Sequence, residues 1–380
     1  MRHWHRLVSA TFLVGTLLGS SALVAAAEED THVDRDDAER AVFVQGNDPA
    51  RNQVLAYRRA RDGELTLTAT YDTGGRGGRV EGAVVDPLAS QGSLLYDARH
   101  HLLIGVNAGS HTIYSFEVDD ARLERREVLD SGGSLPVSLA VHDDLLYVLN
   151  AGGHGSVQGF HIAGRHLQPI ENSTRSLGLV PVSGPTAFLN TPGQVGFTPD
   201  GDQLIVTTKA NGSHIDVFQV REDGRLSDAP VMNPSATPVP FGFTFDPRGH
   251  LVVGEAGTSS VSTYALRDDG TLASIASQTD GQIALCWIER VGHTYFVANA
   301  GSGSVSAYRA DARGRPVLIG TTPVGPGPID LDHAADGRKF LYVQLGGNGR
   351  VAEFRVKSDG SLVPLGSIPS SPTQEGIVAL

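Results

Sequence analysis

One pattern recurs seven times along the chain: a β-branched residue followed three positions later by an aromatic residue. The pairs are Val54/Tyr57, Ile113/Phe116, Val157/Phe160, Ile215/Phe218, Val261/Tyr264, Val305/Tyr308 and Val351/Phe354. Their mean spacing is about 50 residues, the length of a four-stranded propeller blade. Asp-Gly often follows the aromatic residue, and this dipeptide between apolar alternating runs indicates a hairpin. The repeat therefore predicts an all-β fold, a seven-bladed β-propeller of four-stranded antiparallel blades.

Each repeat divides into four apolar runs of strand length, which in the third copy are 136–142, 145–150, 156–162 and 166–170. After position 40, no run of ten or more residues has helical periodicity. We therefore expect four strands, A to D, that run from the axis of each blade to its rim.

The two ends of the repeat region are each incomplete. The run "GIVAL" (376–380) matches an innermost strand with nothing after it, whereas the first repeat begins at "AVFVQ" (41–45) without an innermost strand. We expect the C-terminal strand to pair with the N-terminal blade, because this pairing closes the ring and removes open sheet edges. The propeller domain is accordingly predicted to span 41–380.

The first 27 residues have the pattern of a secretory signal peptide. Arg2 and Arg6 precede an apolar run from Leu7 to Leu18, and "AAA" (25–27) offers a small-residue cleavage site. A membrane anchor is the alternative interpretation of this run. The acidic stretch 28–40 is predicted to be disordered. The sequence thus predicts a secreted or periplasmic protein.

Charge and cysteine content restrict the partners and the bonding of the domain. The formal net charge is −12, which makes nucleic acid and anionic membranes poor partners. Cys286 is the only cysteine, so no internal disulfide forms, and we expect it to be a buried, inert thiol rather than a nucleophile. The expected partner is a small molecule, bound by a monomer.

Three motifs carry a resemblance to a known family. They are the repeated "N-A-G-x-x-S-V-x-x-F" followed by "D-G-x-L", "P-x-x-V-x-F-x-P-D-G" at 192–201, and the terminal "Q-E-G-I-V-A-L". Together they resemble the lactonase-type seven-bladed propellers, which include 6-phosphogluconolactonases and enzymes that lactonise 3-carboxymuconate. The resemblance covers 41–380 and implies the fold more firmly than the reaction, since one propeller scaffold hosts many activities.

The chain departs from the phosphogluconolactonase branch at three matched places. That branch has Pro-His-Ser, Pro-Arg-His and Asn-Glu, where this chain has Pro136-Val137-Ser138, Pro192-Gly193-Gln194 and Thr208-Lys209. The groups expected to handle a phosphorylated lactone are therefore absent. The resemblance implies a lactonase whose cyclic ester is not phosphorylated.

The B-to-C loops and D-to-A connections share one face of a propeller, and ligands tend to bind there, over the central channel. Aligning the "NAG" loops gives an Asn slot, occupied by Asn107, Asn150, Lys209, Glu255, Asn299 and Leu345. Neighbouring repeats thus replace Asn by opposite charges. We predict Glu255 as general base and Lys209 as a stabiliser of carbonyl charge; the alternative is a structural ion pair between blades.

Further residues on or before the inner strands, or in the Asn slot, are expected to bind substrate. They are Gln194, Phe241, Gln282, Trp287, Asp330, Glu375, Asn150 and Asn299, and for each the alternative is packing or channel lining. Two long D-to-A connections, 71–90 and 171–191, are expected to project over the same face. Arg76 and Arg79 in the first either meet an anionic ligand or are merely solvated.

Several chemistries lack their sequence signals. There is no Gly-x-Ser-x-Gly elbow, no phosphate-binding loop, no dinucleotide fingerprint, and no His pair at metal-ligand spacing. The sequence therefore predicts neither cofactor nor metal. Two hypotheses remain: an exported lactonase-like hydrolase, and a non-catalytic propeller that binds a small molecule or a protein at the same face.

Overall fold

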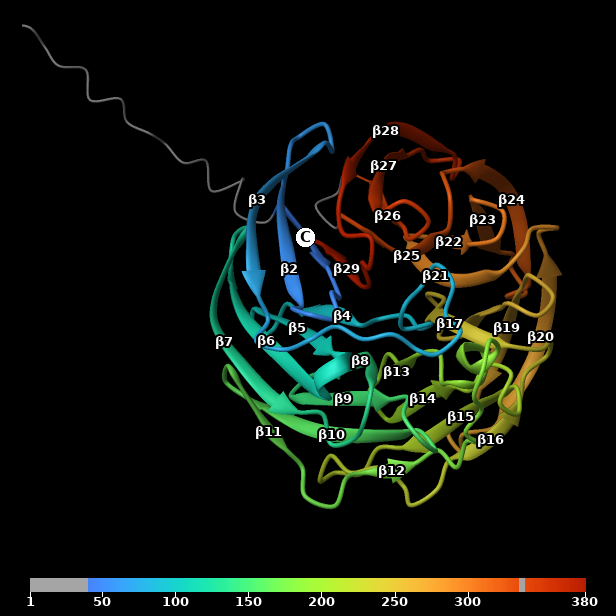
Figure 1. Cartoon of the computed structure of the whole chain (residues 1–380). Coiled ribbons are helices and arrows are strands. Elements are labelled where there is room, and N and C mark those ends of the chain that lie inside the picture. The colour runs from blue at the N-terminus through green and yellow to red at the C-terminus, as the bar shows by residue number, and fades with distance from the viewer. Residues whose placement is uncertain (1–39, 335–338) are drawn as a thin grey trace, which may run out of the picture. The chain divides into compact units, whose positions relative to one another are not determined.

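The computed structural model describes residues 40–334 and 339–380, in which the strands form seven antiparallel sheets around a common axis (Figure 1). The predicted signal peptide (1–27), its alternative as an anchor, and all but the last residue of the predicted disordered segment (28–40) lie outside these residues. In the described part of the chain no helix is long and apolar enough to cross a membrane. The seven-bladed all-β prediction is confirmed.

The sheets follow one another along the chain. The first blade contains β29 (Ile377–Ala379), β1 (Ala41–Gln45), β2 (Gln53–Arg59) and β3 (Leu65–Asp72), and the second contains β4 (Leu94–Asp97), β5 (Leu102–Asn107), β6 (Thr112–Asp119) and β7 (Arg122–Asp130). The third contains β8 (Pro136–His142), β9 (Leu145–Asn150), β10 (Ser156–Ala163) and β11 (His166–Pro169), with β12 (Arg175–Ser176) also paired to β10. The fourth contains β13 (Val195–Phe197), β14 (Gln203–Thr207), β15 (His214–Gln219) and β16 (Val231–Pro234).

The remaining blades keep the same order. The fifth contains β17 (Pro240–Phe245), β18 (Leu251–Glu255), β19 (Ser260–Leu266) and β20 (Leu272–Thr279). The sixth contains β21 (Leu285–Val291), β22 (Thr294–Asn299), β23 (Ser304–Ala310) and β24 (Pro316–Pro323), and the seventh contains β25 (Pro328–His333), β26 (Phe340–Leu345), β27 (Arg350–Val356) and β28 (Leu362–Pro369). Two short 3-10 helices, η2 (Ala108–Ser110) and η3 (Ala187–Asn190), lie in loops.

The first blade joins the two ends of the domain, as the incomplete repeats predict. Strand β29 pairs antiparallel with β1, with Val42 opposite Ala379 and Val44 opposite Ile377. The C-terminal strand therefore supplies the missing innermost strand of the first blade and closes the ring.

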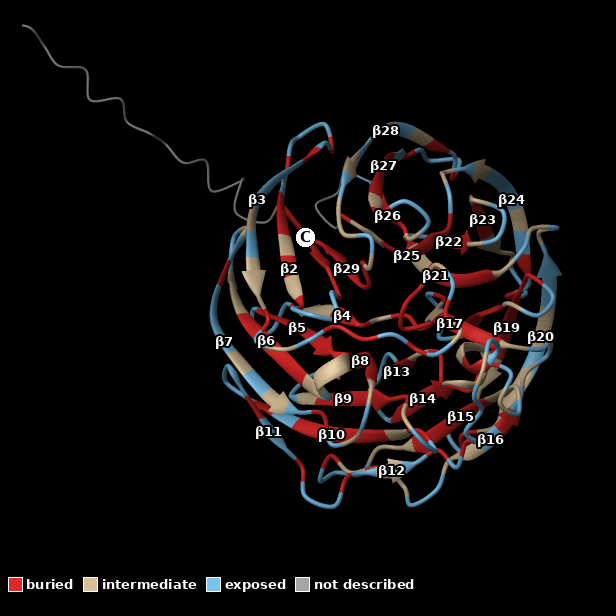
Figure 2. Cartoon of the chain, viewed as in Figure 1, coloured by how far each residue is buried: buried red, intermediate tan, exposed pale blue. Residues whose placement is uncertain are grey.

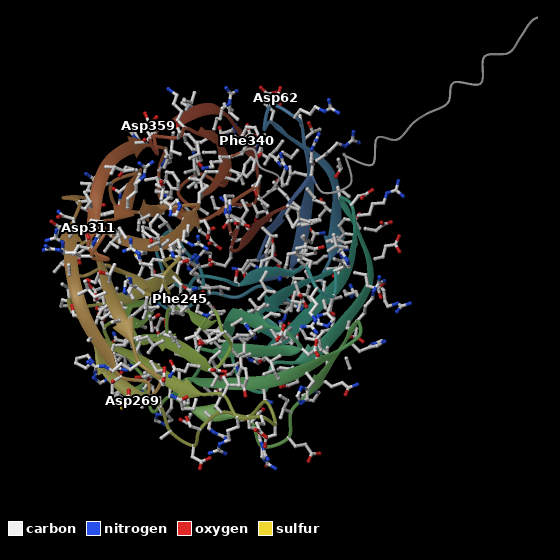
Figure 3. All side chains as sticks on the ribbon, turned by 180° about the vertical axis from the view of Figure 1, so that it is seen from behind. Asp62, Phe245, Asp269, Asp311, Phe340 and Asp359 are labelled. Atoms are coloured by element: carbon white, nitrogen blue, oxygen red, sulfur yellow. The ribbon has the colours of Figure 1, made fainter. Side chains whose placement is uncertain are left out.

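Burial follows the position of a strand in its blade. Inner strands are buried, whereas outer strands such as β7 and β20 are largely exposed (Figure 2). The repeated aromatic residue packs between blades and its hydroxyl, where present, is hydrogen-bonded; Tyr57 Oη donates to the Pro369 carbonyl (3.2 Å). The Asp-Gly dipeptides form the expected turns, with Gly63 at φ 100° and Gly360 at φ 91°. Asp62, Asp269 and Asp359 of these turns lie at the outer edge of the ring (Figure 3).

Candidate functional site

The connection between β3 and β4 crosses the mouth of the propeller, the face that carries the B-to-C loops (Figure 1). Within it, residues 86–91, here called the plug segment, insert into the top of the central channel. Ser90 Oγ donates to the Val137 carbonyl (2.8 Å), and Gln91 N donates to the Gly193 carbonyl (3.0 Å). The plug segment therefore contacts two of the positions at which the chain departs from the phosphogluconolactonase branch.

The second long connection, between β12 and β13, meets the first one above the mouth. Phe188 N donates to the Glu81 carbonyl (3.1 Å), and Gly184 N donates to Glu81 Oε1 (2.9 Å). Both connections thus cover part of the mouth, as expected from their length and their place in the repeat.

Strand register corrects the Asn slot of the fourth blade. In the third, fifth and sixth blades the slot residue ends strand B and lies opposite the first residue of strand C. In the fourth blade this place belongs to Thr208, which exchanges hydrogen bonds with His214. Lys209 is the next residue, where the other blades have Ala108, Ala151, Ala256, Ala300 and Gly346. Lys209 lies past the end of β14 in a turn, with φ 51°, so the direction of its side chain is set by the turn and not by the alternation of the strand.

Lys209 is buried at the mouth and holds both long connections. Its Nζ donates to the carbonyls of Ala89 (2.5 Å) and Phe188 (2.6 Å) and to Thr191 Oγ1 (2.8 Å). Nζ also lies 5.2 Å from the ring centroid of Phe241. Burial lowers the pKa of Lys209 to about 7, although nearby acidic groups oppose this shift. The three acceptors match the three N–H donors of an ammonium.

Asp86, the first residue of the plug segment, lies next to Glu375. Asp86 accepts hydrogen bonds from the N–H groups of Leu88 (2.9 Å), Ala89 (2.7 Å) and Ser90 (3.1 Å), and Glu375 Oε2 accepts one from Leu88 N (3.3 Å). Burial raises the pKa of Asp86, and burial together with the adjacent Asp86 raises that of Glu375 well above its usual range. Because the hydrogen bond between the two carboxyl groups lowers the pKa of Asp86 and raises that of Glu375, Glu375 holds a proton more tightly than Asp86 does.

Asp86 and Lys209 line one pocket of about 480 Å³, here called the mouth pocket. Its wall includes Phe241 and Trp287, whose rings pack edge to face with centroids 4.9 Å apart. Trp287 Nε1 donates to the Ser90 carbonyl (2.8 Å), which ties the wall to the plug segment. Cys286 also lines the pocket, and burial raises the pKa of its thiol, which keeps it protonated and inert.

Glu255 lies apart from the mouth pocket. Its Oε1 accepts from Ser235 Oγ (2.5 Å) and the Tyr264 hydroxyl, and its Oε2 accepts from the hydroxyls of Thr237 and Ser262. The side chain is fully buried and does not line the pocket. Hydroxyl donors, rather than a cation, stabilise this carboxylate, and no ion pair joins it to Lys209 in the described structure. The geometry therefore supports neither a general-base role for Glu255 in the mouth pocket nor the ion-pair alternative.

The two asparagines expected to bind substrate face the interior of their blades. Asn150 exchanges hydrogen bonds with Ser131, and Asn299 Nδ2 donates to Ser304 Oγ (3.2 Å) and Ser306 Oγ (2.9 Å). Gln282 Oε1 accepts from Ser304 Oγ (3.1 Å), outside the mouth pocket. These amides stabilise the ends of strands B and C, so the structure gives them a packing role.

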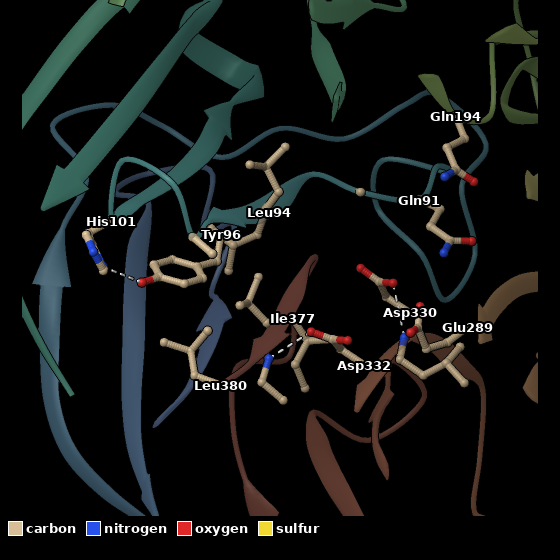
Figure 4. Close-up of a pocket in the computed structure, with 16 residues that line it drawn as sticks. Gln91, Leu94, Tyr96, His101, Gln194, Glu289, Asp330, Asp332, Ile377 and Leu380 are labelled. Atoms are coloured by element: carbon tan, nitrogen blue, oxygen red, sulfur yellow. Dashed lines mark hydrogen bonds between the residues drawn. The ribbon is translucent and has the colours of Figure 1, made fainter. Parts of the chain in front are cut away.

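Gln194 and Asp330 line a second cavity of about 510 Å³ beside β29 and the A-to-B turn of the second blade (Figure 4). The side-chain amide of Gln194 pairs with the backbone of Phe243. Burial raises the pKa of Asp330 well above its usual range. Of the residues expected to bind substrate, only Phe241 and Trp287 therefore share the mouth pocket with Lys209.

One group in the described residues has donor atoms close enough for a metal ion: Glu289, Asp332 and His333, all within 4.8 Å. His333 Nδ1 already lies 2.7 Å from Glu289 Oε1, and Asp332 Oδ2 accepts from Ala379 N (2.8 Å). Burial and the neighbouring Glu289 raise the pKa of Asp332 to about 7. We interpret Glu289 and His333 as an ion pair beside the second cavity, which Glu289 and Asp332 line.

The arginines of the first long connection bind backbone carbonyls. Arg79 donates to the carbonyls of Ala83 and Val84 (3.1 Å), and Arg76 donates to that of Gly109 (3.4 Å). These contacts fold the loop. An anion-binding role for either residue remains without support.

Sequence reasoning missed Asp86. It lies in a loop that has no counterpart in the other repeats, so no alignment of the blades could place it. The sequence signal that could have pointed to Asp86 is an acidic residue between Val85 and Pro87, in a connection that is rich in glycine.

No known protein family and no curated protein matches the chain by sequence. Solved structures are similar to it in fold. A proposed 6-phosphogluconolactonase from Bacteroides fragilis is 16% identical, with a TM-score of 0.71, over 91% of this chain and 98% of that one. The periplasmic gluconolactonase PpgL of Pseudomonas aeruginosa is 16% identical (TM-score 0.68; 89% and 98%), and a Lactobacillus plantarum protein is 18% identical (TM-score 0.66; 90% and 99%). The chain thus has the fold of the lactonase-type seven-bladed propellers.

Proposed function

We propose that this protein is a lactonase-like hydrolase that opens a non-phosphorylated cyclic ester in the mouth pocket. The observation that carries the proposal is the placement of the Asp86 carboxyl group and the Lys209 amine on the wall of one cavity. Hydrolysis of an ester needs a base for water and positive charge near the developing oxyanion. The pocket offers both.

Asp86 is the proposed general base. Water adds to the carbonyl carbon and gives a proton to Asp86, the ring C–O bond breaks, and the departing ring oxygen takes that proton back, which leaves a hydroxy acid. Burial raises the pKa of Asp86, and this makes it a better base near neutral pH than an exposed aspartate. Glu375 holds the proton that lies between the two carboxyl groups, so its own carboxyl group is neutral beside Asp86.

Lys209 acts on the substrate through the electric field of its charge. Its three N–H donors are engaged by the two long connections, so it stabilises negative charge on the substrate carbonyl without a direct hydrogen bond. Lys209 is buried, and at a buried position of low polarity such a charge acts more strongly than it would in water.

A phosphorylated substrate fits this pocket poorly. The positions where the related enzymes have His, Arg and Glu are Val137, Gly193 and Lys209 here, and the plug segment contacts all three. Among the described residues that line the mouth pocket, Lys209 is the only cation, and its donors are already hydrogen-bonded. No lining cation is therefore free to bind a phosphate.

We further propose that the protein acts outside the cytoplasm, as a monomer, on a small molecule. The signal-peptide pattern in 1–27 supports export, and one structural neighbour is itself a periplasmic gluconolactonase.

The competing function is binding without catalysis. The plug segment favours it, because the chain's own residues 89–91 cover the three positions that would meet the substrate in the related enzymes.

The test is a pH-indicator assay of γ- and δ-lactones with the parent and with Asp86→Asn. We expect activity that rises as pH rises through the Asp86 pKa, and a loss of about 100-fold or more in the variant. The matched control is Asp246→Asn. Asp86 and Asp246 are both 5% exposed, and each accepts a hydrogen bond from the backbone N–H of the residue two positions later in the chain. Asp246, however, lies in an A-to-B hairpin.

Glu375→Gln separates the roles of the two carboxyls. It keeps a neutral donor beside Asp86, so we expect it to retain most activity. No turnover of any lactone by the parent, with ligand binding intact, would select the binding function. Equal losses in the Asp86 and Asp246 variants would remove Asp86 from the mechanism.

A further inference from the structure

We propose that the mouth pocket selects cyclic esters that carry an aliphatic chain and rejects polyhydroxylated sugar lactones. This inference rests on the proposed function for its reaction, but its selectivity follows from the pocket wall alone. Three features of the wall carry it: composition, the use of its polar groups, and the gradient of polarity from base to rim.

The wall is almost entirely apolar. Asp86 and Lys209 are the only charged residues among those that line the pocket in the described structure, and aliphatic or aromatic residues make up most of the rest. Phe241 and Trp287 form one continuous aromatic surface. Apolar walls of this kind favour ligands in proportion to the apolar area that they bury.

The few polar groups of the wall are already engaged. Lys209 donates to three oxygens, Asp86 accepts from three N–H groups, and Trp287 Nε1 is bound to the Ser90 carbonyl. A sugar lactone would bring several hydroxyls into this space. Each hydroxyl buried without a partner costs about 1–3 kcal/mol, so a polyol is rejected even where it fits.

Polarity also changes with depth. Asp86 and Lys209 lie at the base, 5% and 1% exposed, whereas Val84 and Ile283 at the rim are 73% and 65% exposed. A ligand that matches this gradient has its ester at the base and an apolar substituent toward the rim. An alkyl-substituted lactone has this arrangement.

Alanines leave room for the substituent. Ala256 and Ala300 line the pocket and stand in the same repeat position that holds Lys209 in the fourth blade. A larger side chain at either place would reduce the space available to an alkyl chain.

The first test is a kinetic series of γ-lactones with alkyl chains of increasing length, run beside gluconolactone. Burial of a methylene contributes about 0.8 kcal/mol, so we expect kcat/KM to rise roughly threefold to fourfold per methylene until the pocket is full, with little turnover of gluconolactone. Ala300→Leu should lower kcat/KM for long chains more than for the unsubstituted ring. The control is Ala276→Leu, a half-buried alanine on the outer strand β20.

The second test measures binding without turnover. Trp287 lines the pocket, and the chain has one other tryptophan, Trp4, so the full chain carrying Trp4→Phe has Trp287 as its single tryptophan and reports occupancy by fluorescence. The probes are 2-alkylcyclopentanones, which have no ester to hydrolyse, and their affinity should rise with chain length. If it does while no lactone is hydrolysed, the proposed reaction is wrong and the selectivity stands. If affinity is independent of chain length, or gluconolactone binds as tightly as the alkyl probes, the selectivity is overturned.

Discussion

Removal of residues 376–380 should destabilise the whole domain. Strand β29 supplies the innermost strand of the first blade, where Ile377 and Val378 are buried against its neighbours. Each of these side chains contributes about 2 kcal/mol of burial. The backbone bonds from Gln45 N to the Gly376 carbonyl (3.0 Å) and from Leu380 N to the Ala41 carbonyl (2.8 Å) add about 1 kcal/mol each.

The expected loss is therefore about 6 kcal/mol, which is comparable to the whole stability of many domains, about 5–15 kcal/mol. Urea unfolding of the parent and the truncated chain measures it directly. A peptide of residues 371–380 added in excess should restore part of the loss, because it can occupy the vacated edge of β1. If the truncated chain loses less than about 2 kcal/mol, closure by β29 is not what holds the ring, and the calculation is refuted.

Two further predictions concern buried ionisable groups. Asp216 is 1% exposed with Oδ1 unpartnered, and burial raises its pKa to about 7. The free energy of unfolding of the parent should therefore fall as pH rises from about 4 to about 7. The difference in this free energy between Asp216→Asn and the parent should shift in favour of the variant by up to about 4 kcal/mol between pH 4 and pH 8. An equal effect of the substitution at both pH values in urea unfolding would contradict this. Lys209→Met removes the donor from three acceptors in the two long connections, so hydrogen exchange of the backbone amides in 86–91 and 186–191 should become at least about tenfold faster. Exchange in β9 should not change. Unchanged exchange in the two loops would show that Lys209 does not hold them.

Most of the fold could be predicted because the sequence pattern that encodes it repeats along the chain. Seven copies of one spacing fix the number of blades, and the unmatched runs at 41–45 and 376–380 identify the closure. Each of these features repeats or complements another part of the same chain, so errors in one strand boundary do not alter the architecture.

The candidate site was less predictable because it depends on what interrupts the repeat. The opposite charges at 209 and 255 suggested a pair, but alignment across loops of unequal length placed Lys209 in the slot that Thr208 occupies. Glu255 ends β18 and binds hydroxyls inside its blade, whereas Lys209 lies one residue beyond that place, in a turn with φ 51°, and reaches the mouth.

The plug segment explains why resemblance to the related enzymes predicts the fold better than the chemistry. The fold brings Val137, Gly193 and Lys209 to the mouth, where Ala89, Ser90 and Gln91 form hydrogen bonds with them. The mouth pocket lies beside Trp287, and its carboxyl group, Asp86, comes from the connection between β3 and β4. Because the plug segment already contacts these three positions, introducing His, Arg and Glu there without removing the plug segment should not give activity toward a phosphorylated lactone.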